Sequence, residues 1–169
     1  MAKKLWTEVD EELVAKVKQL VVGALGAARY GETALEVTRQ AMQWADQLIE
    51  TFESVNPLPR PVACEPGCSF CCTGLVEATP AEVFLIVLVI SRYFAPPKLE
   101  RLKERVLRMA ALKVGKSKRE LAAARQTQPC PLLEEDKCLV YPFRPLMCRA
   151  MHSLDREHCR SSFAAGDLS

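Results

Sequence analysis

The chain is poor in histidine and lacks the signatures of several common enzyme classes. Its 169 residues include only two histidines, His152 and His158. No glycine-rich phosphate loop is present, and no combination of serine, histidine and aspartate suggests a hydrolase. These absences argue against nucleotide hydrolysis and triad chemistry, and they leave the sequence without an obvious general base.

Long apolar runs are missing as well. The most apolar stretch, residues 83–90, is far too short to cross a bilayer. The first residues, MAKKLWTEVDEELV, turn acidic before the apolar segment of a signal peptide develops. We therefore expect no membrane span and a cytoplasmic location. Thiols stay reduced there, so clustered cysteines indicate metal or redox chemistry more often than disulfides.

What is present predicts a mostly α-helical fold, a helical bundle with a cysteine-rich loop region that forms a metal site. Apolar residues recur at helical spacing over residues 7–28 and again from Thr33, with Gly31 between. The two expected N-termini have capping-box spacing, Thr7 with Asp10 and Thr33 with Glu36. Residues 1–55 are therefore predicted to form a helical hairpin whose apolar stripes are buried on the core of a single domain.

Residues 56–169 are predicted to form the cysteine-cluster region. Prolines make residues 56–61 a non-helical linker. Thr79, Pro80 and Glu82 mark the start of a helix that is apolar on nearly every side, so we expect it to be central and buried. Further on, the sequence CLVY suggests a short strand, and Pro145 suggests the first turn of a short helix carrying Cys148 and Arg149.

A long basic helix is predicted over residues 98–125, interrupted near Gly115. It holds ten Lys or Arg against three Asp or Glu, whereas residues 1–56 hold six against nine. A solvated surface is the simplest interpretation of this basic face. No aromatic residues are interleaved with the charges, so nucleic acid is not expected. A protein partner at this helix stays an open hypothesis.

Eight cysteines are the most informative feature of the sequence. They fall in two separate clusters, Cys64-x3-Cys68-x2-Cys71-Cys72 and Cys130-x7-Cys138-x9-Cys148, followed by Cys159. The turn at residues 65–67 can fold the first sulfurs inward around an ion. Neighbouring side chains on an extended backbone point in opposite directions, so Cys71 and Cys72 are not expected to serve one ion equally. One of the two could face a second metal or the core.

Thiolates are costly to bury without cations, which argues for metal and against eight inert core thiols or a disulfide framework. The leading predicted ligands are Cys64, Cys68, Cys71 and Cys148. Cys72, Cys130 and Cys138 come next, and Cys159 last. Arg144 and Arg149 are expected to offset the remaining negative charge around the ligands. His152 shares a possible helical face with Cys148 but is better explained as a surface or hydrogen-bonded histidine.

The order of these motifs resembles the CxxCxxCC family of zinc- or iron-chelating domains. The segment CEPGCSFCC matches the first half, with three residues rather than two between the first two cysteines. The second half matches at Cys130-Pro131-Leu132-Leu133, Cys138, Tyr141, Arg144-Pro145-Leu146 and Cys148-Arg149, with Cys159 as a trailing cysteine. The resemblance spans residues 64–159, leaves the N-terminal hairpin outside, and implies metal binding.

The choice of metal stays open, with an iron–sulfur cluster slightly preferred over zinc. Cys68-x2-Cys71 forms a zinc-type knuckle, whereas Cys130-Pro131 is a pairing that recurs beside iron–sulfur clusters. The triplet Cys64, Cys68 and Cys71 also resembles that of radical SAM enzymes, but those have a barrel of alternating strands and helices. Two functions follow as hypotheses: a structural or metal-handling protein, or an iron–sulfur redox or modifying enzyme with an open coordination position.

Overall fold

The fold is described by a computed structural model that covers residues 2–27, 31–65 and 67–165. The mostly α-helical class is confirmed. The helices are α1 (Ala2–Ala27), α2 (Gly31–Val55), α3 (Pro80–Tyr93), α4 (Pro96–Lys113), α5 (Lys118–Ala123), α6 (Leu146–Ala150) and α7 (Arg156–Ala165). Short 3-10 turns are η1 (Phe70–Thr73), η2 (Arg125–Thr127) and η3 (Tyr141–Phe143), and the two strands are β1 (Leu133–Glu134) and β2 (Lys137–Cys138).

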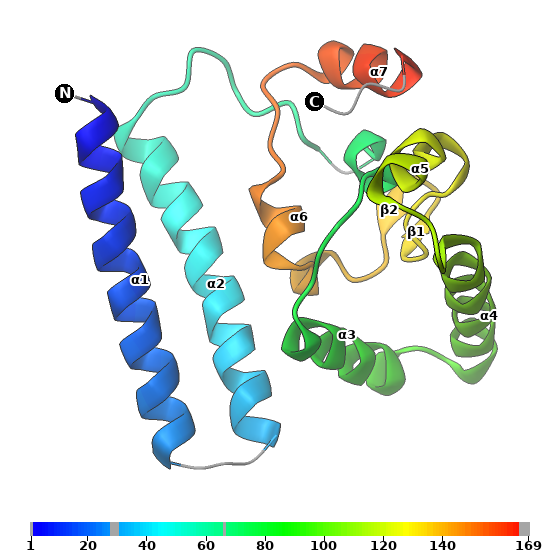
Figure 1. Cartoon of the computed structure of the whole chain (residues 1–169), viewed down its shortest axis with the longest axis horizontal. Coiled ribbons are helices and arrows are strands. Elements are labelled where there is room, and N and C mark those ends of the chain that lie inside the picture. Colours follow the sequence, from blue (N-terminus) through cyan, green and yellow to red (C-terminus); the bar gives the residue numbers. More distant parts are fainter. Residues whose placement is uncertain (1, 28–30, 66, 166–169) are drawn as a thin grey trace.

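Helices α1 and α2 form the predicted antiparallel hairpin along one side of the molecule (Figure 1). Their predicted starts were wrong. Helix α1 begins at Ala2, so Thr7 lies inside it, because no helix-breaking residue precedes Thr7. Helix α2 begins at Gly31, and Glu36 binds the side chains of Arg39 and Gln40 instead of capping the helix.

The apolar stripes of the hairpin are largely exposed, contrary to the prediction that they would be buried. On α1, Val14 is 66% exposed and Leu20 is 61% exposed, and on α2 the side chain of Leu48 is also exposed. Met42 of α2 is buried, at 2% exposure. Helix α1 packs against α2, and α2 packs against α3 and α6. Two helices alone cannot enclose a complete apolar face, which explains the exposure.

The core lies between α3, α4 and the segment that follows the β-hairpin. Its buried side chains are Ile86, Ile90, Leu102 and Val140, with Phe94, Leu99, Leu132, Cys138 and Leu139 packed against them. Helix α3 buries one face only, because Val83, Phe84, Val87 and Leu88 on the other side are 47–65% exposed. The prediction of a central helix buried all round was therefore wrong. The chain has too few elements to cover both faces.

Local signals predicted several boundaries correctly. Thr79 caps α3 in a full capping box with Glu82, and Pro80 is the first helical residue. The basic helix is interrupted as expected, since Gly115 has a φ of +77° and lies between α4 and α5. Ser117, which was not predicted as a cap, begins α5 through a second capping box with Glu120.

The region after Pro129 is built around a small β-hairpin. Strands β1 and β2 pair antiparallel, with Leu133 opposite Cys138. Glu135 and Asp136 form the connecting turn, at φ values of 49° and 58°. The predicted strand at CLVY is wrong apart from Cys138, since Tyr141 already belongs to η3. Pro145 lies directly before α6 as its N-cap residue, so the predicted short helix carrying Cys148 is confirmed.

Candidate metal centre

The first cysteine cluster folds as a tight turn followed by η1. The amide of Cys68 donates to the carbonyl of Glu65 at 3.0 Å, and Gly67 takes a φ of +95°, which favours glycine. Pro66 lies outside the described residues. Cys71 and Cys72 are consecutive residues of η1, so their side chains start about 120° apart around its axis.

Cys64 lies beside the C-terminal segment that carries Cys159. The amide of Ala63 donates to the carbonyl of Ser153 at 2.8 Å, and the amide of Ser153 donates to the sulfur of Cys64 at 3.3 Å. Arg156 and Glu65 form an ion pair at 2.5 Å across the same two segments. Helix α7, which carries Cys159, also packs against η1.

Cys72 lies beside the second cluster. The amide of Cys130 donates to the carbonyl of Cys72 at 2.7 Å, and the amide of Leu133 donates to the carbonyl of Cys130 at 3.0 Å. Leu133 pairs across the β-hairpin with Cys138. Main-chain contacts thus connect Cys72 of the first cluster with Cys130 of the second and, through Leu133, with the strand that carries Cys138.

The thiols of both clusters influence one another electrostatically. Desolvation raises the pKa of the Cys148 thiol to about 11, with smaller contributions from Cys130, Cys138 and Cys71. Desolvation also raises the pKa of the Cys130 thiol. Metal binding must therefore supply the free energy that deprotonates these thiols.

The adjacent thiols of Cys71 and Cys72 shift each other's protonation. The Cys72 thiol lowers the pKa of Cys71, and the Cys71 thiol raises the pKa of Cys72. The guanidinium of Arg144 also lowers the pKa of Cys71. Arg144 itself lies over the ring of Tyr141, with its central carbon 4.1 Å from the ring centroid. Cys71 is exposed and is favoured as the thiolate of the pair.

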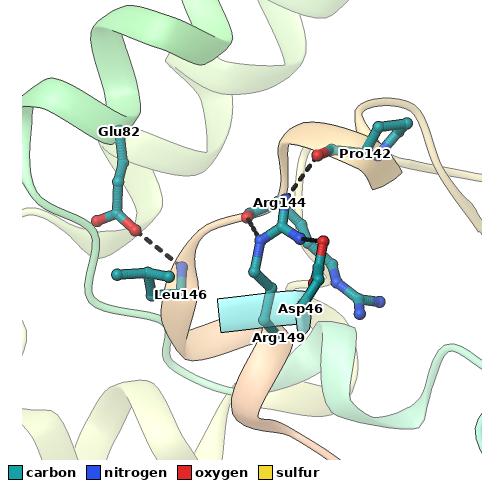
Figure 2. Close-up of polar contacts among 6 residues, drawn as sticks. All are labelled: Asp46, Glu82, Pro142, Arg144, Leu146 and Arg149. Carbon is teal, nitrogen blue, oxygen red and sulfur yellow. Dashed lines mark hydrogen bonds and ion pairs between the residues drawn. The ribbon is translucent and has the colours of Figure 1, made fainter. Parts of the chain in front are cut away.

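Arg149, the residue after Cys148, holds α6 in place (Figure 2). It is only 3% exposed, and it donates to the carbonyl of Arg144 at 3.0 Å, to the carbonyl of Pro142 at 2.5 Å, and to the carboxylate of Asp46. Its guanidinium therefore joins α2, η3 and α6. Asp46 was not among the predicted site residues, although an acid one turn after the buried Met42 on an amphipathic helix is a recognisable signal.

Glu82 connects the cap of α3 to α6 (Figure 2). It is 4% exposed, and one carboxylate oxygen accepts the amide of Leu146 at 2.8 Å. The other oxygen accepts the amide and hydroxyl of Thr79 at 2.6 and 2.9 Å. Burial raises the pKa of Glu82, but these hydrogen bonds outweigh it and lower the pKa overall. Glu82 was predicted as a cap only, and its contact with α6 needed the tertiary structure.

Each of the two histidines contacts an acidic side chain. Nδ1 of His152 is 3.7 Å from the carboxylate of Glu53. The amide of His158 donates to the side chain of Asp155 at 2.9 Å.

Among residues 2–27, 31–65 and 67–165, no three His, Cys, Asp or Glu side chains converge closely enough to hold a metal ion without further movement. Within the same described residues, no helix combines the length and the hydropathy of a membrane span.

A cavity of about 320 Å³ lies between α2 and the segment from η3 to α6. It is lined by Asp46, Ile49, Glu50, Glu53, Val62, Tyr141, Pro142, Arg144, Arg149 and His152. No cysteine is among these described lining residues, so the cavity does not open directly onto the thiols.

A helical chain with eight free thiols, contributed by segments that lie far apart in the sequence, has the character of a thiolate metal-binding protein. The model of the CxxCxxCC family, described as "Putative zinc- or iron-chelating domain", matches residues 63–162. The chain belongs to this family, which confirms the resemblance seen in the sequence. Comparisons with curated proteins and with solved structures gave no match.

Proposed function

We propose that this chain is a metal-binding protein that uses its cysteine thiolates to hold an iron–sulfur cluster or zinc, with the iron–sulfur cluster preferred. The proposed ligands are Cys64, Cys68, Cys71, Cys72, Cys130, Cys138, Cys148 and Cys159. The observation that supports it best is the meeting of the two cysteine clusters at η1, through the 2.7 Å contact between Cys130 and Cys72. Family membership supports the same function.

The donor set fits a soft metal. All eight cysteines are free thiols, and thiolates are preferred ligands of zinc and of iron–sulfur clusters. The closing movement that the thiols still require is consistent with binding coupled to local folding, as in other small metal domains. Desolvation raises the pKa of Cys130 and Cys148 overall, but Lys113 and Arg105 act on Cys130, and Arg144 on Cys71 and Cys148, in the direction that favours the thiolate. Each region therefore has a cation that offsets part of the thiolate charge.

The preference for iron rests on the spacing of the first cysteines and on Cys130-Pro131. We propose a structural, storage or delivery role in the cytoplasm, with the basic surface of α4 and α5 as the site of a protein partner.

Anaerobic purification followed by absorption spectroscopy and analysis for iron, sulfide and zinc tests this proposal. We expect brown protein with inorganic sulfide, because iron–sulfur centres absorb visible light and zinc does not. Changing Cys68 or Cys148 to Ser should remove metal, since a hydroxyl is a poor substitute for a soft thiolate. Colourless protein with stoichiometric zinc would show that the bound metal is zinc and not iron. Protein that takes up neither metal would contradict the proposal.

A further inference from the structure

We infer that the exposed apolar side of α3 is an interface with a second copy of this chain. This α3 face consists of Val83, Phe84, Val87 and Leu88. In the inferred dimer the two α3 helices run antiparallel about a two-fold axis, so that the acidic α2 of each copy lies opposite the basic α4 of the other. The inference rests on the proposed function only in treating the basic surface of α4 as a partner surface.

The α3 face is a continuous apolar surface. Its side chains include pairs spaced three and four residues apart, which adjoin along one side of a helix. The opposite side of α3 is already occupied, since Ile86 and Ile90 belong to the core. Helix α3 therefore has one apolar side in the core and another in contact with water. An exposed contiguous apolar patch of this kind marks an interaction surface.

The total surface of the chain is large enough to include a stable interface. A compact monomer of 18.9 kDa exposes about 8,300 Å² by the usual scaling of surface with mass. This chain exposes 12555 Å². Part of the excess comes from the hairpin, whose apolar stripes are also exposed. The excess is still several times the roughly 800 Å² that each partner buries in a standard protein interface.

The charges on the two sides of the α3 face favour a second copy as the partner. Helix α2 packs against α3 and carries five Asp or Glu against one Arg. Helix α4 begins three residues after α3 ends and carries six Lys or Arg against two Glu. Figure 1 shows α3 between the hairpin and α4. One apolar face with opposite charges on its two sides is complementary to itself when a two-fold axis exchanges those sides.

Several of these charges are available to a partner. Glu32 and Glu50 of α2 are exposed and form no ion pair within the described part of the chain. The same holds for Arg101 and Arg108 of α4, again among the described residues. Each helix therefore has charged side chains that a second copy can pair without breaking an ion pair inside the chain.

The same charges decide how the two copies are oriented. With the two-fold axis perpendicular to α3, the two α3 helices are antiparallel and each α2 lies opposite the partner's α4. With the axis along α3, α2 would lie opposite α2 and α4 opposite α4. Juxtaposed like charges weaken association, so the antiparallel arrangement is favoured. Its stability should also fall as salt is added, because salt screens exposed charge pairs.

Sedimentation equilibrium of the full-length chain in reducing buffer tests the interface without interference from disulfides. We expect the wild type to be a dimer at micromolar concentration. Phe84→Asp should raise the dissociation constant about 100-fold or more, because the two-fold axis repeats the change on both copies. Val114→Asp is the matched control, since Val114 is 79% exposed just beyond α4, and this variant should dimerise as the wild type does. Circular dichroism should show both variants to be folded.

A second measurement needs no substitution. Chains labelled with light and heavy nitrogen are mixed and treated with a carbodiimide, which joins carboxylates to amines. Mass spectrometry then selects crosslinked peptides that pair a light chain with a heavy one. We expect such links between carboxylates of α2 and lysines of α4. Links from Glu100 or Glu104 of one copy to lysines of α4 in the other, without any between α2 and α4, would overturn the antiparallel arrangement.

The interface itself is overturned by a wild type that remains monomeric, or by equal dimerisation of the Phe84→Asp and Val114→Asp variants. It is also overturned if the chain is monomeric alone and binds a different protein through the α3 face. Metal analysis of the same samples separates this inference from the proposed function. A monomer that binds iron or zinc would reject the dimer only, and a dimer that binds no metal would reject the metal-binding proposal only.

Discussion

Replacing Arg149 with Met is the sharpest test of how the N-terminal hairpin supports the cysteine region. The substitution keeps much of the apolar side-chain stem and removes every donor of a guanidinium that is 3% exposed. Two carbonyls, those of Arg144 and Pro142, lose their partner, and so does the carboxylate of Asp46. Losing one member of a buried charge pair typically costs about 3–5 kcal/mol.

The solvent exposure of Asp46 lowers the expected free-energy cost of this substitution. The side chain of Asp46 is 44% exposed, so water can solvate its carboxylate once the guanidinium is gone. We therefore expect Arg149→Met to lower the free energy of unfolding by about 3 kcal/mol, at the low end of that range. Asp46→Asn keeps an acceptor and leaves Arg149 bonded to both carbonyls, so it should cost only about 1 kcal/mol.

The assay is urea unfolding of metal-free protein followed by circular dichroism, with Arg108→Met as the matched control. Arg108 lies exposed on α4, and its replacement should change the stability by less than about 0.5 kcal/mol. An Arg149→Met variant as stable as this control, or an Asp46→Asn variant that is the less stable of the two, would contradict the expected role of Arg149. Metal affinity should fall with Arg149→Met as well, because α6 carries Cys148.

Four further predictions use other parts of the structure. Verified removal of metal should lower the unfolding free energy by several kcal/mol, and an unchanged melting curve would contradict this. Glu82→Gln should destabilise metal-free protein by about 1–3 kcal/mol at neutral pH. The pKa of Glu82 in the folded protein lies below its ordinary value of 4.5, so the Glu82 carboxylate stabilises the fold above pH 4.5. The difference in unfolding free energy between wild type and variant should therefore disappear as the pH falls through the folded pKa. In metal-free protein at neutral pH, iodoacetamide should label Cys71 first, and Cys72→Ala should slow that labelling by removing the neighbouring thiol that lowers the pKa of Cys71; equal rates at all thiols would be contrary evidence. Gly115→Ala should cost about 1–2 kcal/mol in urea unfolding because of its φ of +77°, whereas Gly23→Ala within α1 should be neutral or stabilising.

Features governed by neighbours in sequence were predictable. The cap of α3 at Thr79 depends on groups three residues apart, and the break at Gly115 depends on one residue's backbone freedom. The predicted starts of α1 and α2 were wrong, although they rested on the same capping-box spacing that correctly predicted the start of α3. Capping-box spacing also occurs inside helices, and at Glu36 the side chain prefers Arg39 one turn ahead.

Burial was less predictable than helix formation. The all-round apolar composition of α3 suggested a central helix, yet Phe84 is 65% exposed. Apolar composition indicates which side chains favour burial, but the number and arrangement of packed elements determine which of them become buried. For the same reason, the apolar stripe of α1 correctly indicated a helix without indicating that Leu20 would remain exposed.

Residue types and their spacing were enough to establish that the chain is helical and that it belongs to a cysteine-rich chelating family. Which cysteine segments become neighbours depends on the three-dimensional packing, since Cys72 and Cys130 meet through a main-chain hydrogen bond that residue spacing does not indicate. This packing also decided the partner of Arg149, because Asp46 is 103 residues away and outside the family match. Local structure follows from interactions within a few residues, whereas these contacts exist only after the hairpin, α3 and α6 have packed together.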